Sequence, residues 1–61
     1  ADYYDRVSRA EALLLSGKPA EAHAAYVAAF DRYDHLAGNI AGTKAQAARI
    51  AATLGLQDFT L

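Results

Sequence analysis

Apolar and small side chains recur at three- and four-residue spacing along three segments of the chain, which is the spacing of one face of an α-helix. In the first segment, residues 3–16, this face consists of Tyr3, Val7, Ala10 and Leu14. β-branched residues are few, and the alternation of apolar and polar residues that is typical of a strand is absent. The pattern therefore predicts an all-α fold.

The first predicted helix has signals at both ends. Asp2 stands at the N-cap position, and Asp5 lies in the first turn, where the helix dipole favours a carboxylate. Gly17 predicts the end of the helix, because glycine adopts the left-handed conformation of a C-terminal cap without steric cost.

The second predicted helix covers residues 19–37. Pro19 suits the first helical position, and Gly38 is predicted to end the helix. Val27 and Phe30 form a second apolar face, so we expect this helix to contact two neighbours and to lie between the other two. Its main face consists of Ala22, Tyr26, Ala29, Tyr33 and Leu36 or Ala37.

The third predicted helix covers residues 40–54, with Asn39 as its N-cap and with Gly55 and Leu56 as a C-terminal cap. Short connections between helices predict antiparallel neighbours. We therefore expect three antiparallel helices, running up, down and up, in one domain over residues 1–55, followed by a short C-terminal tail over residues 56–61. The apolar face of the third helix consists of Ala47, Ile50, Ala51 and Leu54.

The interior of such a bundle is slight. The chain has 61 residues, of which 16 are alanine and 17 are Leu, Ile, Val, Phe or Tyr. Because a chain of this size buries only roughly 60% of its unfolded surface, and alanine buries a single methyl group, little apolar area is available. We expect the chain to be stabilised by another protein, by self-association or by belonging to something longer.

Charge and composition exclude several classes of function. The net charge of −1 argues against binding of nucleic acid, which favours a basic excess. With no cysteine, neither a disulfide nor a thiolate metal site can form. The uncharged run Ala22–Phe30 has nine residues, far fewer than the roughly 20 of a membrane helix. No basic-then-apolar signal segment opens the chain, so we expect a cytoplasmic protein with no cofactor and no membrane contact.

Small residues, larger apolar residues and a turn glycine recur at fixed intervals along the first two segments, at Ala10, Leu13, Gly17, Ala22, Tyr26 and Ala29. These intervals resemble those of a tetratricopeptide-type helical hairpin. The resemblance covers about one and a half repeat units and implies binding of a peptide or another protein. Arg6 and Arg9 depart from the family pattern, which has an aromatic residue or leucine early in the first helix. An alanine-rich three-helix bundle of another kind would match part of the same pattern.

Two further resemblances are weaker. The turn from Gly17 to Ala22 is similar to that of the microtubule-interacting-and-transport three-helix bundle, which implies a partner helix bound beside the third helix. The segment Gln46–Leu61 resembles the helix-turn-helix pattern, which implies the alternative function of a DNA-binding fragment of a bacterial regulator. In that reading a recognition helix begins with Gln57, Asp58 and Thr60.

No residue pattern indicates catalysis. Asp31 and His35 are four residues apart on the second predicted helix and can form an exposed pair, but a metal site needs three or four ligands. His23 is expected at the surface, and no serine or threonine has a base at a recognisable spacing. We therefore expect a chain that is not an enzyme.

The sequence favours a protein-interaction module or a small docking subunit. Tyrosine and phenylalanine offer large contact areas with few torsions. Tyr26 and Tyr33 are expected inside, whereas Tyr3 and Tyr4 are adjacent, so at least one faces outward. The residues predicted to bind the partner are apolar groups with no obvious internal contact, namely Val27, Phe30, Leu56, Phe59 and Leu61, with Tyr4 as an anchor at the rim.

Overall fold

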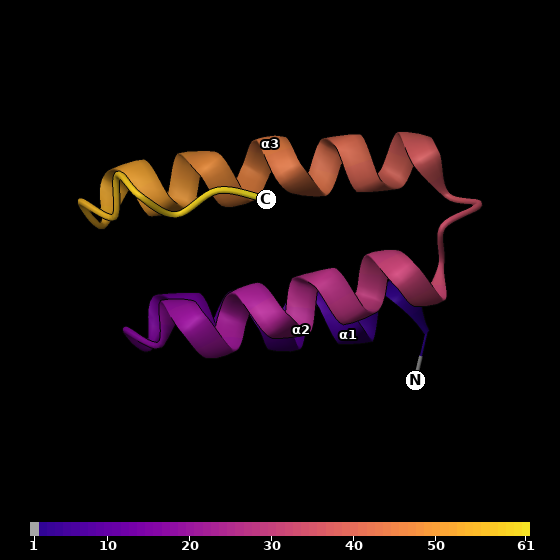
Figure 1. Cartoon of the computed structure of the whole chain (residues 1–61), viewed down its shortest axis with the longest axis horizontal. Coiled ribbons are helices and arrows are strands. Elements are labelled where there is room, and N and C mark those ends of the chain that lie inside the picture. The colour runs from indigo at the N-terminus through magenta and orange to yellow at the C-terminus, as the bar shows by residue number, and fades with distance from the viewer. Residues whose placement is uncertain (1) are drawn as a thin grey trace.

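The computed structural model describes residues 2–61, which form three helices: α1 (Tyr3–Leu15), α2 (Pro19–Arg32) and α3 (Ala37–Thr53). α1 and α2 run antiparallel, and α3 runs in the same direction as α1 (Figure 1). Within the described residues no strand is formed. The predicted all-α fold with helices running up, down and up is confirmed.

The predicted ends of the first helix are confirmed to within one residue. A carboxylate oxygen of Asp2 accepts a hydrogen bond of 2.9 Å from the backbone N–H of Asp5. Gly17 has a φ of +77°, and the N–H of Lys18 donates to the carbonyl oxygen of Leu13 at 3.0 Å. This is the hydrogen-bond pattern of a Schellman cap, which satisfies carbonyl groups that the helix itself cannot pair.

The same cap ends α3. Gly55 has a φ of +75°, and its N–H donates to the carbonyl oxygen of Ala52 at 3.1 Å. The N–H of Leu56 donates to the carbonyl oxygen of Ala51 at 2.8 Å. The prediction of a cap formed by Gly55 and Leu56 is therefore confirmed.

The boundary between α2 and α3 differs from the prediction. α2 ends at Arg32 rather than at residue 37, and α3 begins at Ala37, so Gly38 and Asn39 lie inside the first turn of α3. The N-cap of α3 is Leu36, which provides no side-chain hydrogen bond. The turn between them is made by residues with negative φ, for which no left-handed glycine is needed. The glycine signal was therefore misleading here.

The core is built mostly from methyl groups. Its largest fully buried side chains are those of Tyr26 and Leu14. Tyr3 is also buried and its neighbour Tyr4 is 65% exposed, as expected for adjacent residues on a helix. Tyr33 is half-buried. Among residues 2–61, eight are buried, namely Tyr3, Ala10, Leu14, Ala22, Tyr26, Ala29, Ala47 and Ala51.

The central helix is α1, not α2 as predicted. α1 packs against both other helices, most extensively against α2, whereas α2 and α3 have little direct contact. The C-terminal tail doubles back beside α3 (Figure 1) and contributes apolar side chains to the core. The ring centroid of Phe59 lies 6.3 Å from that of Tyr26 and 6.2 Å from that of His23, and both of these residues are on α2. The tail therefore packs against α2, at Tyr26 of the predicted main face and at His23.

Polar contacts join the first turn of α1 to the first two turns of α3. The hydroxyl oxygens of Tyr3 and Thr43 lie 2.6 Å apart, and the Tyr3 hydroxyl lies 3.2 Å from the carbonyl oxygen of Asn39. The side-chain amide of Asn39 donates to the hydroxyl oxygen of Tyr4 at 3.1 Å. Asn39 therefore links two helices instead of capping one.

Candidate functional site

Most of the predicted partner-binding residues have internal contacts. Phe30, Leu56, Phe59 and Leu61 are half-buried and pack against the core, so the assumption that they lack an internal contact is wrong. Tyr4 and Val27 are exposed, at 65% and 38%, but they lie on different helices. Because the hydroxyl of Tyr4 accepts a hydrogen bond from Asn39, that side chain already has a polar contact within the chain.

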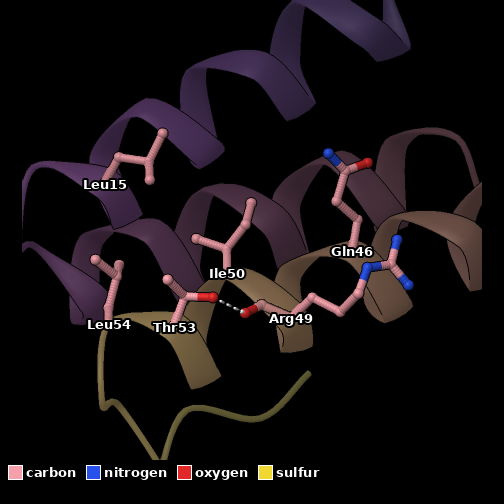
Figure 2. Close-up of a pocket in the computed structure, with 6 residues that line it drawn as sticks. All are labelled: Leu15, Gln46, Arg49, Ile50, Thr53 and Leu54. Atoms are coloured by element: carbon pink, nitrogen blue, oxygen red, sulfur yellow. Dashed lines mark hydrogen bonds between the residues drawn. The ribbon is translucent and has the colours of Figure 1, made fainter.

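The exposed leucines mark a different surface. Leu15 is 57% exposed and Leu54 is 42% exposed, at the C-terminal ends of α1 and α3. Between them lies an open hollow of about 280 Å³, which we call the leucine cleft (Figure 2). Its lining consists of Leu15, Gln46, Arg49, Ile50, Thr53 and Leu54.

The parallel course of α1 and α3 explains how the leucine cleft forms. Both helices end at the same end of the bundle, so Leu15 on one and Ile50 and Leu54 on the other converge (Figure 2). Residues Leu13–Leu15 are three consecutive leucines, and successive side chains on a helix point about 100° apart. With Leu14 in the core, Leu15 cannot be buried against the same neighbours.

Two of the three polar residues of the leucine cleft lie toward one end. Gln46 and Arg49 are exposed and stand away from the two leucines (Figure 2). The hydroxyl of Thr53 donates to the carbonyl oxygen of Arg49 at 3.0 Å, so it is already satisfied within α3. In the lining, Arg49 is the one residue with a formal charge. The cleft is thus an apolar depression with a cation at its rim.

The sequence analysis missed Leu15 and placed Leu54 in the core. The run of three leucines was a usable signal, because an amphipathic helix with one buried face must expose at least one of them. The position of Leu54 beside Leu15 was not readable, since it depends on how α3 packs against α1.

The candidate chemical groups do not come together. His35 lies in the turn after α2, so it does not share a helical face with Asp31 as predicted. His23 is exposed, as expected, and contacts the ring of Phe59. Over residues 2–61, no group of three His, Asp or Glu side chains is placed to hold a metal ion.

The tail bears on the helix-turn-helix hypothesis. Gln57 and Asp58 form a turn, and residues 59–61 have no regular structure, so the residues assigned to the start of a recognition helix are not helical here.

None of the helices in the described part of the chain is long and apolar enough to cross a membrane.

Comparisons with models of protein families, with curated protein sequences and with solved structures gave no match. The resemblance to a tetratricopeptide hairpin therefore stays a prediction.

Proposed function

We propose that the chain is a non-catalytic protein-interaction module whose leucine cleft binds a large apolar side chain of a partner protein. The observation that carries this proposal is the convergence of Leu15 and Leu54, both exposed, on one hollow formed by two helices. Exposed apolar side chains that gather around a depression are typical of protein-binding surfaces.

The size and chemistry of the cleft favour a protein segment over a small-molecule substrate. At about 280 Å³ it is smaller than the roughly 300–1,000 Å³ of ligand pockets and is open to solvent. Its lining has no histidine, carboxylate or cysteine, so it offers no general base and no strong nucleophile. A stable interface between globular proteins buries about 800 Å² per partner. An interface of that area would cover about a fifth of the 3971 Å² surface of the chain. The six residues that line the leucine cleft offer far less area, so we expect a short segment to bind.

A titration followed by amide NMR tests the proposal. The probes are short helical peptides that differ in one anchor residue, leucine, phenylalanine or alanine. The leucine and phenylalanine peptides are expected to shift the amide signals of Leu15, Ile50 and Leu54, and Leu54→Asp is expected to weaken binding about tenfold or more.

The matched control is Val27→Asp, which introduces the same charge at a residue of similar exposure on α2, 38% against 42%. It is expected to leave binding unchanged. Equal effects of the two substitutions, or no shift of the cleft amides by any apolar anchor, would show that the leucine cleft is not the docking site.

A further inference from the structure

A second hollow lies along the other flank of α1, between α1 and α2. It measures about 570 Å³, about twice the volume of the leucine cleft, and we call it the arginine groove. Its lining shares no residue with the leucine cleft, so the two surfaces are separate. The arginine groove is lined by Asp5, Arg6, Arg9, Leu13, Ala25 and Ala28.

The apolar part of the arginine groove comes from both helices. Leu13 and Ala25 are half-buried and pack against the core, and Ala28 lies three residues beyond Ala25 on the same side of α2. Because two of these three residues are alanines, an approaching backbone can come close to the floor of the groove. An apolar side chain placed there would contact Leu13 and the two alanine methyl groups.

The charged part comes from α1 alone. Arg6 and Arg9 are exposed, and within residues 2–61 neither forms an ion pair, although Asp5 stands four residues before Arg9. Asp5 is the one carboxylate in the lining, so two guanidinium groups face a single negative charge there. The groove is locally cationic on a chain whose net charge is −1.

We propose that the arginine groove binds an acidic amphipathic helix of a partner protein. Arg6 and Arg9 are three residues apart, which places them about 4.5 Å apart along the axis of α1. Carboxylates at positions i and i+3 or i+4 of a second helix have matching spacing and can form bidentate hydrogen bonds with the two guanidinium groups. The apolar face of that helix covers Leu13 and the alanines.

The apolar lining favours a protein helix over nucleic acid. Proteins bind the phosphates of nucleic acid with clustered cations and bind single-stranded bases by stacking them on aromatic rings. The lining of the arginine groove contains no aromatic residue. Alanine and leucine instead complement an aliphatic helix face. This inference does not rest on the leucine cleft, since the two surfaces have different linings.

The probe is a dye-labelled synthetic helix with leucine on one face and glutamate beside it, measured by fluorescence anisotropy. We compare it with the same peptide carrying lysine for glutamate and with a DNA duplex of random sequence. The glutamate peptide is expected to bind, with an affinity that falls as salt is raised, whereas the lysine peptide and the duplex are not.

Substitutions then locate the site. The double variant Arg6→Glu, Arg9→Glu is expected to bind the glutamate peptide about tenfold more weakly or worse and to gain affinity for the lysine peptide. The control Lys18→Glu, Lys44→Glu makes the same change of charge at two residues that line neither the arginine groove nor the leucine cleft, and it is expected to bind like the wild type. Circular dichroism serves to check that each variant stays helical.

Three results would overturn the proposal. They are no binding of the glutamate peptide, equal or tighter binding of the duplex, and equal losses in the two double variants. A further variant tests the apolar part of the groove without altering charge. Ala28→Phe, at an exposed position, fills the groove and is expected to lower the affinity for the glutamate peptide. An unchanged affinity would also count against the proposal.

Discussion

Phe59 gives the sharpest test of whether the tail belongs to the folded interior. Truncating a fully buried phenylalanine to alanine costs about 3–5 kcal/mol. Because Phe59 is half-buried, against Tyr26 and His23, we expect Phe59→Ala to lower the free energy of unfolding by about 2 kcal/mol. For a domain of this size each kcal/mol lowers Tm by about 4–8 °C, so a decrease of about 8–16 °C follows.

Thermal unfolding followed by far-ultraviolet circular dichroism measures this shift. The control is Leu15→Ala, which truncates a side chain that is 57% exposed and is expected to change stability by less than about 0.5 kcal/mol. The competing hypothesis from the sequence makes Phe59 a free docking residue whose loss leaves the isolated chain unaffected. A melting curve of Phe59→Ala that coincides with the wild type would refute the packing argument and restore that hypothesis.

Four further substitutions test the backbone, one hydrogen bond and the ionisation of one buried tyrosine. Gly17→Ala forces alanine to a φ of +77° and should cost about 1 kcal/mol, whereas Gly42→Ala, inside α3 with open space around the added methyl group, should stabilise by about 0.5–1 kcal/mol in urea titrations. Tyr3→Phe removes the hydroxyl contact with Thr43, and urea titration should show a loss of about 1 kcal/mol. Burial, with a smaller effect of the negative charge of Glu11, raises the pKa of Tyr26 above its ordinary value of 10.0. Because the folded state disfavours ionisation of Tyr26, the neutral side chain contributes to the free energy of unfolding. This contribution is fully present below pH 10 and is lost as the pH rises through the pKa of Tyr26 in the folded state. In urea titrations over that range, Tyr26→Phe should remove this part of the decline, and an unchanged decline would contradict the assignment.

Much of the fold was readable because its signals are local. Asp2 caps the helix that follows it, and Pro19 begins α2. Gly17 and Gly55 end helices because both adopt positive φ. Each of these signals acts within about one helical turn, so neighbouring residues in the sequence are enough to interpret it.

The remainder depends on residues far apart in the sequence. The contact between Phe59 and Tyr26 joins positions 33 apart, and no local pattern indicates that the tail packs there. The end of α2 at Arg32 was misread because a turn without a left-handed residue leaves no glycine signal. The leucine cleft was missed for a similar reason, since it exists only where the ends of two helices meet.

The position of α1 has a consequence for the order in which the molecule opens. α3 is joined to the rest mainly through α1, with the tail as its other connection, whereas α1 and α2 form a hairpin of contacts close in sequence. Releasing α3 therefore breaks fewer contacts than separating the hairpin. Native-state hydrogen exchange should find that the amides of α3 lose protection through partial unfolding, while those of α1 and α2 exchange only when the whole chain unfolds.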